Sequence, residues 1–297
     1  MTRTRQTIPT TTDTTQARGG QLPIGVCLRA IDAEPRWWLE SARRLDEAGY
    51  AGLWCWDHLE GKRDMTVGVV EAWTALAMAA ATTVRATIGP FVLNVMNRHP
   101  ALVARMASTL QIASGGRVIL GIGIGGAEQE HRAYGIEFPD APERVERLEE
   151  AVAVIRALWT GAPVTRPSPY YPLDGAVAFP VPDPVPPILI GGETAAGARL
   201  AARIGDGWSA FEKNFEANLP LYLAGLEEAG RRREDQLVLI GSQGGDWLGD
   251  GSLRDTPWYH DPRGTWGRWS TAGADGAVVL ARTTDDIDAL VEAVERW

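Results

Sequence analysis

The sequence predicts an α/β fold, a single (β/α)8 barrel of the TIM type, from three observations. Short apolar runs rich in β-branched residues alternate with helical stretches, and this order implies parallel strands because each return to the sheet requires a crossover. Eight such units occur along the 297 residues, a length typical of one barrel. The apolar fraction of 45% supplies a large core. Chemistry in such a barrel belongs to the loops that follow the strands.

The predicted strands are bounded by glycine, proline or polar turn residues. In order, they are residues 24–28, 52–56, 87–93, 117–122, 187–190, 207–211, 236–240 and 276–280. The helices between them follow from apolar residues at helical spacing and from their end signals. The clearest are 35–48, about 70–82, 101–113, 142–158 and 195–204. The first of them stops at Gly49, and the fourth starts at Pro142 and has an apolar stripe that extends to Leu158.

Two long segments interrupt this alternation. Residues 163–187, after the fourth strand, hold nine of the 19 prolines, which remove backbone donors and fix φ. We therefore expect an extended, ordered loop there rather than a barrel strand. A second, tryptophan-rich loop at 242–269 follows the seventh strand. Residues 1–20 are expected to be a disordered tail, so that the barrel is one domain at 21–297.

The formal net charge is −9, from 29 basic and 38 acidic residues. A nucleic acid or an anionic membrane requires clustered Lys and Arg, so neither is an expected partner. The sequence contains neither the apolar core of a signal peptide nor the ~18 apolar residues of a membrane helix. Cys27 and Cys55 are expected to be buried free thiols, and no histidine lies at zinc-ligand spacing from them. These features predict a soluble cytoplasmic protein without a structural metal.

Asp57-His58 directly follows the second predicted strand, at the end of the barrel where chemistry is expected. A histidine there is a candidate acid or base, or a hydrogen-bond donor to a cofactor. The alternative is a histidine that bonds to backbone and only caps the strand end.

The third strand ends in Gly-Pro and bulky apolar residues. Pro90 followed by Phe91 and Val92 suits a bent strand end that forms a hydrophobic shelf, and Asn94 is a candidate to hydrogen-bond a ring carbonyl or amide. Ordinary barrel packing is the alternative.

Glycines cluster at two further strand ends. At 121–126 they let the backbone approach a flat ligand, or form only a tight turn. This stretch does not open a Rossmann unit, so it is not a dinucleotide fingerprint. Gly191-Gly192 expose backbone N–H groups beside the positive end of the helix at 195–204, which favours an anion site. A short strand-to-helix turn explains these glycines equally well, and Trp208 is a candidate to close the same pocket.

Seven of the 12 tryptophans fall at or after strand ends. They are Trp54, Trp56, Trp208, Trp247, Trp258, Trp266 and Trp269. Several are candidates to line a cleft for a planar ligand, although core filling explains any single one.

Taken together, these pieces resemble the bacterial luciferase-like flavin and deazaflavin oxidoreductases. The matching stretches, in order, are residues 48–54 with Asp57-His58-Leu59, 98–101, 114–117 into 120–123, 143–144 through 158–159, 186–192 and 205–208. They cover about 22–211 in the family's order, with 273–280 as the last strand. The combination is specific, although no single stretch is.

The resemblance implies an isoalloxazine or deazaflavin ring across the strand ends, with a non-prolyl cis peptide, Pro90-Phe91 or Phe91-Val92, supporting one ring face. It implies that His58 faces the ring edge or the substrate, that Glu128 is a second catalytic candidate, and that backbone N–H groups of 191–193 hold the cofactor phosphate. The cofactor-binding residues that it suggests are Pro90, Phe91, Val92, Asn94, Gly123, Gly125, Gln129, Gly191, Gly192, Glu193 and Trp208. A homodimer is expected by resemblance alone.

Within this family the sequence looks most like the branch that uses the deazaflavin coenzyme F-420 (F420), which carries hydride but does not activate oxygen. The expected function is hydride transfer between F420 and an unidentified small organic substrate. Two alternatives are an FMN-dependent monooxygenase of the same fold and a barrel that binds a flavin without turnover. Gly126 stands where deazaflavin sugar-phosphate dehydrogenases carry a Glu, with Glu128 two residues later, so their substrate chemistry is not expected to transfer.

Overall fold

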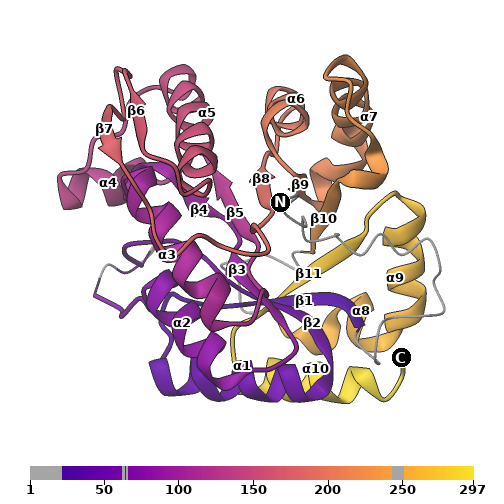
Figure 1. Ribbon diagram of the computed structural model, residues 1–297. Coiled ribbons are helices and arrows are strands. Elements are labelled where there is room, and N and C mark those ends of the chain that lie inside the picture. Colours follow the sequence, from indigo (N-terminus) through magenta and orange to yellow (C-terminus); the bar gives the residue numbers. More distant parts are fainter. Residues whose placement is uncertain (1–21, 62–63, 65, 243–250) are drawn as a thin grey trace.

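Parallel strands form one sheet that closes into a barrel (Figure 1). The computed structural model describes residues 22–61, 64, 66–242 and 251–297. The sheet contains β1 (Leu22–Leu28), β2 (Tyr50–Cys55), β3 (Thr87–Pro90), β4 (Leu93–Asn94), β5 (Leu120–Gly123), β8 (Ile188–Gly191), β9 (Gly207–Phe211), β10 (Leu237–Ser242) and β11 (Gly276–Ala281). Their order is β3-β2-β1-β11-β10-β9-β8-β5-β4, and each pairing is parallel. The predicted α/β barrel is therefore confirmed.

The third predicted strand is split into β3 and β4, and this split lies at the seam of the barrel. The peptide bond Phe91-Val92 between the two halves is cis, which confirms the non-prolyl cis peptide and selects the second of its two predicted positions. The seam is closed by hydrogen bonds from Ile88 N to Arg117 O (2.8 Å) and from Ile119 N to Ile88 O (3.0 Å). The single strand predicted at 87–93 is wrong in this detail.

The helices surround the barrel (Figure 1). They are α1 (Pro35–Ala48), α2 (Ala72–Thr82), α3 (Pro100–Ala113), α4 (Glu128–Tyr134), α5 (Ala141–Leu158), α6 (Ala195–Ile204), α7 (Glu212–Glu228), α8 (Pro257–His260), α9 (Pro262–Thr271) and α10 (Thr284–Val294). The end signals are confirmed for α1, which has Pro35 in its first turn and Gly49 after its last, at a φ of 93°. No helix of the described residues is long and apolar enough to cross a bilayer.

The proline-rich segment 163–187 is outside the barrel sheet, as predicted, but it is not merely a loop. It contains β6 (Val164–Arg166) and β7 (Leu173–Ala176), which pair as an antiparallel hairpin. The tip of the hairpin is attached to α5, where Tyr170 Oη donates to Glu146 at 2.6 Å. The residues of the tip therefore find their partners on a helix, which local sequence cannot indicate.

The loop predicted at 242–269 is wrong for its described part, because residues from 253 onward are mainly helical. A short 3-10 turn, Leu253–Asp255, leads into α8 and α9. Thr256 and Asp261 cap these two helices, and each helix has a proline in its first turn. Trp258 and Trp269 stack with ring centroids 6.2 Å apart and are buried, so they fill the core rather than line a cleft. Trp247 lies outside the described residues.

The indole of Trp54 belongs to the apolar cluster that fills the barrel interior. Trp54 packs with Phe91, Leu189 and Val278 inside the barrel, while a larger apolar cluster lies between the strands and the helices. A Cβ on Gly25 would lie 2.3 Å from Trp54 Nε1, so glycine makes room for the ring. The prediction that Trp54 lines a cleft is therefore replaced by a packing role.

Cys27 and Cys55 are buried free thiols, as predicted. Burial raises the pKa of both thiols, so both stay protonated at neutral pH.

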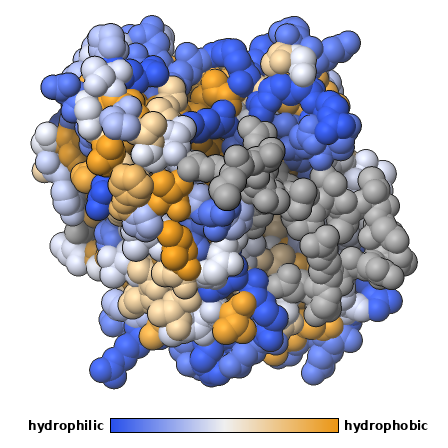
Figure 2. Space-filling model, in the orientation of Figure 1, coloured by the Kyte–Doolittle hydropathy of each residue, from blue (hydrophilic) through white to orange (hydrophobic). Residues whose placement is uncertain are grey.

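The outer surface on the face drawn in Figure 2 is mostly hydrophilic, and apolar residues gather over α3 and the chain around the hairpin. Exposed apolar side chains in these segments include Leu102, Ile112, Val177 and Phe179. The homodimer stays a prediction from the resemblance.

Candidate active site

A cavity of about 1430 Å³ lies at the carboxyl ends of the barrel strands. Its floor is formed by the ends of β4, β5, β8 and β9, and its walls include α4, the start of α5 and the first turns of α6. This is the end of a (β/α)8 barrel at which ligands and catalytic groups are expected.

Most of the predicted site residues line this one cavity. They are His58, Phe91, Val92, Asn94, Gly123, Gly125, Glu128, Gln129, Gly191, Gly192 and Glu193. The agreement follows from the barrel, since every one of these residues is at or just after the carboxyl end of a strand.

Pro90 and Trp208 are not among the cavity-lining residues. Pro90 is buried in β3. Trp208 is fully buried on the helix side of β9, where it stacks on Phe215 and Tyr222 of α7 with centroid distances of 5.2 Å to each. Its Nε1 donates to Gly192 O at 2.9 Å. Because side chains alternate across a strand, Trp208 supports the glycine turn from behind instead of closing the pocket.

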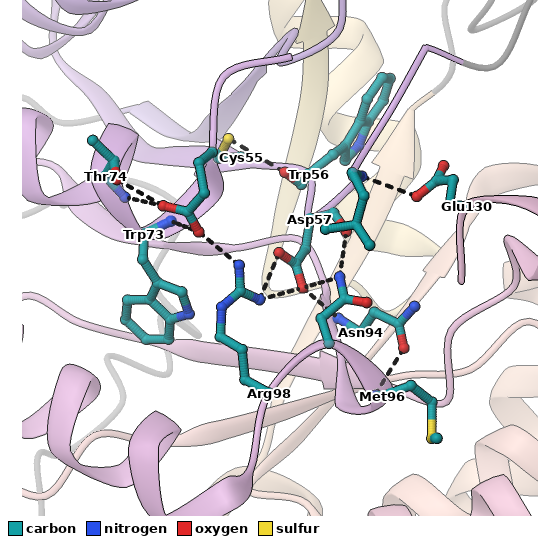
Figure 3. A network of polar contacts seen from close by, with 12 residues as sticks. Cys55, Trp56, Asp57, Trp73, Thr74, Asn94, Met96, Arg98 and Glu130 are labelled. Carbon is teal, nitrogen blue, oxygen red and sulfur yellow. Dashed lines mark hydrogen bonds and ion pairs between the residues drawn. The ribbon is translucent and has the colours of Figure 1, made fainter. Parts of the chain in front are cut away.

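A buried ion pair holds the end of β2 against the chain after β4 (Figure 3). Arg98 Nη1 donates to both carboxylate oxygens of Asp57, at 2.8 and 2.9 Å, and Nη2 donates to Glu71 at 2.6 Å. Asp57 also accepts from the backbone N–H of Asn94 at 3.0 Å. Burial raises the pKa of the Asp57 carboxyl, and the guanidinium of Arg98 opposes that rise. This network fixes the backbone that carries His58 and Asn94.

His58 is paired with a carboxylate that the sequence analysis missed. Its Nδ1 lies 2.7 Å from Glu130 Oε1, and the second oxygen of Glu130 accepts from Leu59 N at 3.0 Å. Glu128, the glutamate expected from the resemblance, also lines the cavity, but its side chain is 65% exposed and pairs with Arg132 at 2.9 Å rather than with His58. Side chains two residues apart on a helix point roughly 200° apart, so only one of the two glutamates is able to point toward His58. The spacing shows that the two glutamates cannot both pair with the histidine, and the tertiary structure decides which one does.

Asn94 is held by protein groups on several sides. Its Oδ1 accepts from Met96 N at 3.0 Å, and its Nδ2 contacts Nε2 of the fully buried His131 at 3.0 Å. His131 Nδ1 in turn lies 2.8 Å from Ala127 O. A role of Asn94 at a ring edge stays a prediction.

Three of the strand-end glycines lie directly against protein side chains. A Cβ on Gly191 would lie 2.8 Å from Val92 Cγ2, and one on Gly123 would lie 3.1 Å from the same atom. A Cβ on Gly125, at a φ of +74°, would lie 2.3 Å from Asn94 Oδ1. The close approach that these glycines permit is therefore that of Val92 and Asn94.

Gly125→Ala should destabilise the fold by about 1–3 kcal/mol, because it combines an unfavourable φ with a clash against the pinned Asn94 side chain. Gly126→Ala is the matched control, since a Cβ there would meet nothing within 4 Å. Chemical denaturation of both variants measures the difference. A Gly125→Ala protein as stable as Gly126→Ala would contradict this account of Gly125.

The anion site predicted after β8 stays a prediction, and one of its candidate donors already has a partner. Gly192 N already donates to Ser209 O at 3.0 Å, so this N–H is used within the protein. Thr194 caps α6 by accepting from Gly197 N at 3.1 Å. The first-turn N–H groups of α6, including that of the cavity-lining Ala196, have no acceptor within the helix and lie at its positive end.

Two cations missed by the sequence analysis lie on the same wall. Arg199 and Arg203 of α6 both line the cavity. Arg199 is 3.8 Å from Glu228, and Arg203 pairs with Glu149. Arg199, about one turn into α6, and the N–H groups at the start of that helix are the candidate anion-attracting corner of the cavity, whereas Arg203 is in the last turn of α6.

Comparison with known proteins shows which family this sequence matches. Residues 9–243 match the model of the luciferase-like monooxygenase family. An F420-dependent glucose-6-phosphate dehydrogenase of Microbacterium testaceum is 37% identical over 201 residues, which is 66% of this chain and 60% of that protein. An F420-dependent hydroxymycolic acid dehydrogenase of Mycobacterium tuberculosis is 32% identical over 226 residues, 75% of this chain and 61% of that protein. The alignments thus span about three fifths of these two relatives.

Solved structures show the same fold. An F420-dependent secondary alcohol dehydrogenase in complex with an F420–acetone adduct superimposes with a TM-score of 0.78 at 23% identity, covering 93% of this chain and 98% of that one. Monooxygenase RslO1 from Streptomyces bottropensis gives a TM-score of 0.71 at 19% identity, with the same two coverages.

Proposed function

Because the chain belongs to the luciferase-like monooxygenase family, we propose that it is an oxidoreductase that transfers a hydride between coenzyme F420 and a small organic substrate. Two observations together support this proposal. The relatives include F420-dependent dehydrogenases. The cavity has the acid–base candidate His58 at one side and the candidate anion-attracting corner at the other. The substrates in the relatives' names belong to those proteins. By the resemblance, Gly126 stands where the sugar-phosphate dehydrogenases of the family carry a Glu.

The residues of the cavity suit a flat ring with an anionic tail. Phe91 and Val92 provide an apolar floor at the strand ends, and the start of α6 with Arg199 provides donors and positive charge for a phosphate. F420, when bound, supplies a ring carbon that accepts or gives up a hydride. Positioning the two reactants in a site with apolar walls is then the main contribution of the protein.

His58 is the residue that we assign to the proton that accompanies hydride transfer. It lines the cavity, and its imidazole is held in place by Glu130. A substrate alcohol loses this proton on oxidation, and a carbonyl gains it on reduction. A catalytic role of Glu128 stays a prediction, with its side chain paired to Arg132.

Binding titrations of the purified protein with F420 and with FMN, side by side, test the proposal. We expect tight binding of F420 and hydride transfer from an alcohol to F420, or from reduced F420 to a carbonyl. Turnover with reduced FMN and oxygen, but none with F420, would overturn the proposal in favour of an FMN-dependent monooxygenase. Tight binding of F420 without hydride exchange across many acceptors would favour the non-catalytic barrel.

Ala196→Asp should weaken F420 binding far more than Ala196→Asn does. An aspartate in the first turn of α6 suits the helix dipole and so preserves the fold, but it brings a negative charge to the proposed phosphate position. Asparagine has the same size without the charge, which makes it the matched control. Gly192 is unsuitable for this test, because any Cβ there would lie 2.7 Å from the backbone carbon of Gly197. Equal F420 affinity in the two variants would refute the assigned anion corner.

A further inference from the structure

We propose that Glu130 is a positioning residue that fixes the proton of neutral His58 on Nδ1 and so commits Nε2 to proton exchange with the substrate. The part that concerns turnover rests on the proposed function. The part that concerns the position of the proton rests on the geometry alone.

The geometry of the pair leaves little choice of proton position. Glu130 is only 4% exposed, and its two carboxylate oxygens face two different groups. Oε1 lies 2.7 Å from His58 Nδ1, and Oε2 accepts from Leu59 N at 3.0 Å. A carboxylate only accepts hydrogen bonds, so Nδ1 is the ring nitrogen that donates. Exchange of a proton with a substrate then has to proceed through Nε2.

The helix that carries Glu130, α4, is held by contacts to the chain after β2 and to the end of β4. Tyr134 Oη, also on α4, donates to Leu59 O at 3.1 Å. The next residue along α4, His131, meets the Asn94 amide, whose Nδ2 only donates, so His131 Nε2 accepts. α4 therefore ties the chain after β2 to the end of β4, and the carboxylate of Glu130 is held against the imidazole. Supporting partners of this kind set the orientation and tautomer of a functional histidine.

Glu130→Gln tests this proposal because it preserves the size of the side chain and reverses the direction of its hydrogen bond with His58 Nδ1. Leu59 N is an obligate donor, so the glutamine must turn its carbonyl oxygen toward Leu59. Its NH2 group then faces His58 Nδ1, which has to accept. The proton of the neutral ring moves to Nε2, and the lone pair that takes a proton from an alcohol is lost. In the serine protease triad, the aspartate-to-asparagine change has the same logic and costs about 10⁴-fold in kcat.

Nitrogen-15 NMR of the imidazole rings, at alkaline pH and without cofactor, gives a readout that does not depend on activity. We expect the Nδ1–H tautomer for His58 in the wild type and the Nε2–H tautomer in Glu130→Gln, with His58→Asn used to assign the signal. Glu130→Asp keeps a carboxylate and should retain the wild-type tautomer. Glu137→Gln, an exposed glutamate paired with Arg147, is the matched control and should change neither tautomer nor turnover.

Turnover with F420 provides the second readout. We expect Glu130→Gln to lower kcat by about 10²- to 10⁴-fold with F420 affinity and thermal stability near those of the wild type, and Glu130→Asp to recover part of that loss. An Nε2–H tautomer in the wild type, an unchanged tautomer in Glu130→Gln, or an inverted tautomer with unchanged turnover would each overturn the proposal. A wild type that neither binds F420 nor exchanges hydride with it would overturn the proposed function, and the NMR result would still decide whether Glu130 sets the tautomer.

Discussion

His58→Ala should lower turnover by about 10²- to 10⁴-fold while cofactor affinity stays close to that of the wild type. The location of His58 explains why turnover should fall while cofactor affinity does not. His58 lies beside α4 and Glu130, whereas the anion-attracting corner is formed by α6 across the cavity. Removing the imidazole therefore removes the proton acceptor or donor without touching the groups assigned to the cofactor phosphate. Steady-state kinetics together with an F420 titration measure the two quantities separately.

His260→Ala is the matched control for this substitution, because His260 is exposed on α8 and is not among the cavity-lining residues. It should leave both kcat and F420 affinity unchanged. If His58→Ala turns over as fast as His260→Ala, the acid–base role of His58 is wrong. If its F420 affinity falls in proportion to its rate, His58 contributes to binding instead.

Arg98→Ala should destabilise the fold by about 3–5 kcal/mol, because it leaves the Asp57 carboxylate buried without its cation. The Asp57 side chain is 2% exposed and that of Arg98 is 15% exposed, so water replaces the lost partner poorly. Arg43→Ala is the control, since Arg43 pairs with Glu40 and Glu47 on the exposed surface of α1, where such pairs contribute ~1 kcal/mol or less. Urea denaturation at neutral pH measures the free energy of unfolding of both variants.

The stability lost in Arg98→Ala should depend on pH in one direction. Burial raises the folded-state pKa of Asp57, so its ionised form costs stability above that pKa, and the cost is relieved as pH falls toward the unfolded value of about 3.9. Removing Arg98 raises the folded pKa further. The stability gap between Arg98→Ala and the wild type should therefore narrow as pH falls from neutral to acid. A gap that widens toward acid pH would show that the loss does not come from the Asp57 charge.

The double variant Asp57→Asn/Arg98→Ala tests the same ion pair by removing the buried negative charge as well as its cation. With both charges removed, no uncompensated buried ion remains, and the double variant should be more stable at neutral pH than Arg98→Ala alone.

Much of the barrel was predictable because its signals are local. Alternating apolar runs and helices, Pro35 and Gly49 at the ends of α1, and the prolines that kept 163–187 out of the barrel sheet all act within a few residues of chain. The position of the site followed from the fold, since side chains after parallel strands gather at one end. The helices at 253–271 were missed because their capping residues, Thr and Asp before Pro, are also common in turns.

The sequence by itself determined the closed sheet, the end of the barrel that carries the cavity, and the family. Only the tertiary structure decided that Glu130 rather than Glu128 supports the histidine, that Arg98 neutralises Asp57, and that Val92 occupies the space left by glycines. The physical reason is separation along the chain. The histidine and its carboxylate are 72 residues apart and the ion pair 41, and contacts of that range depend on how the strands and helices assemble. Periodicity and end signals, which act over one or two turns of chain, contain no information about them.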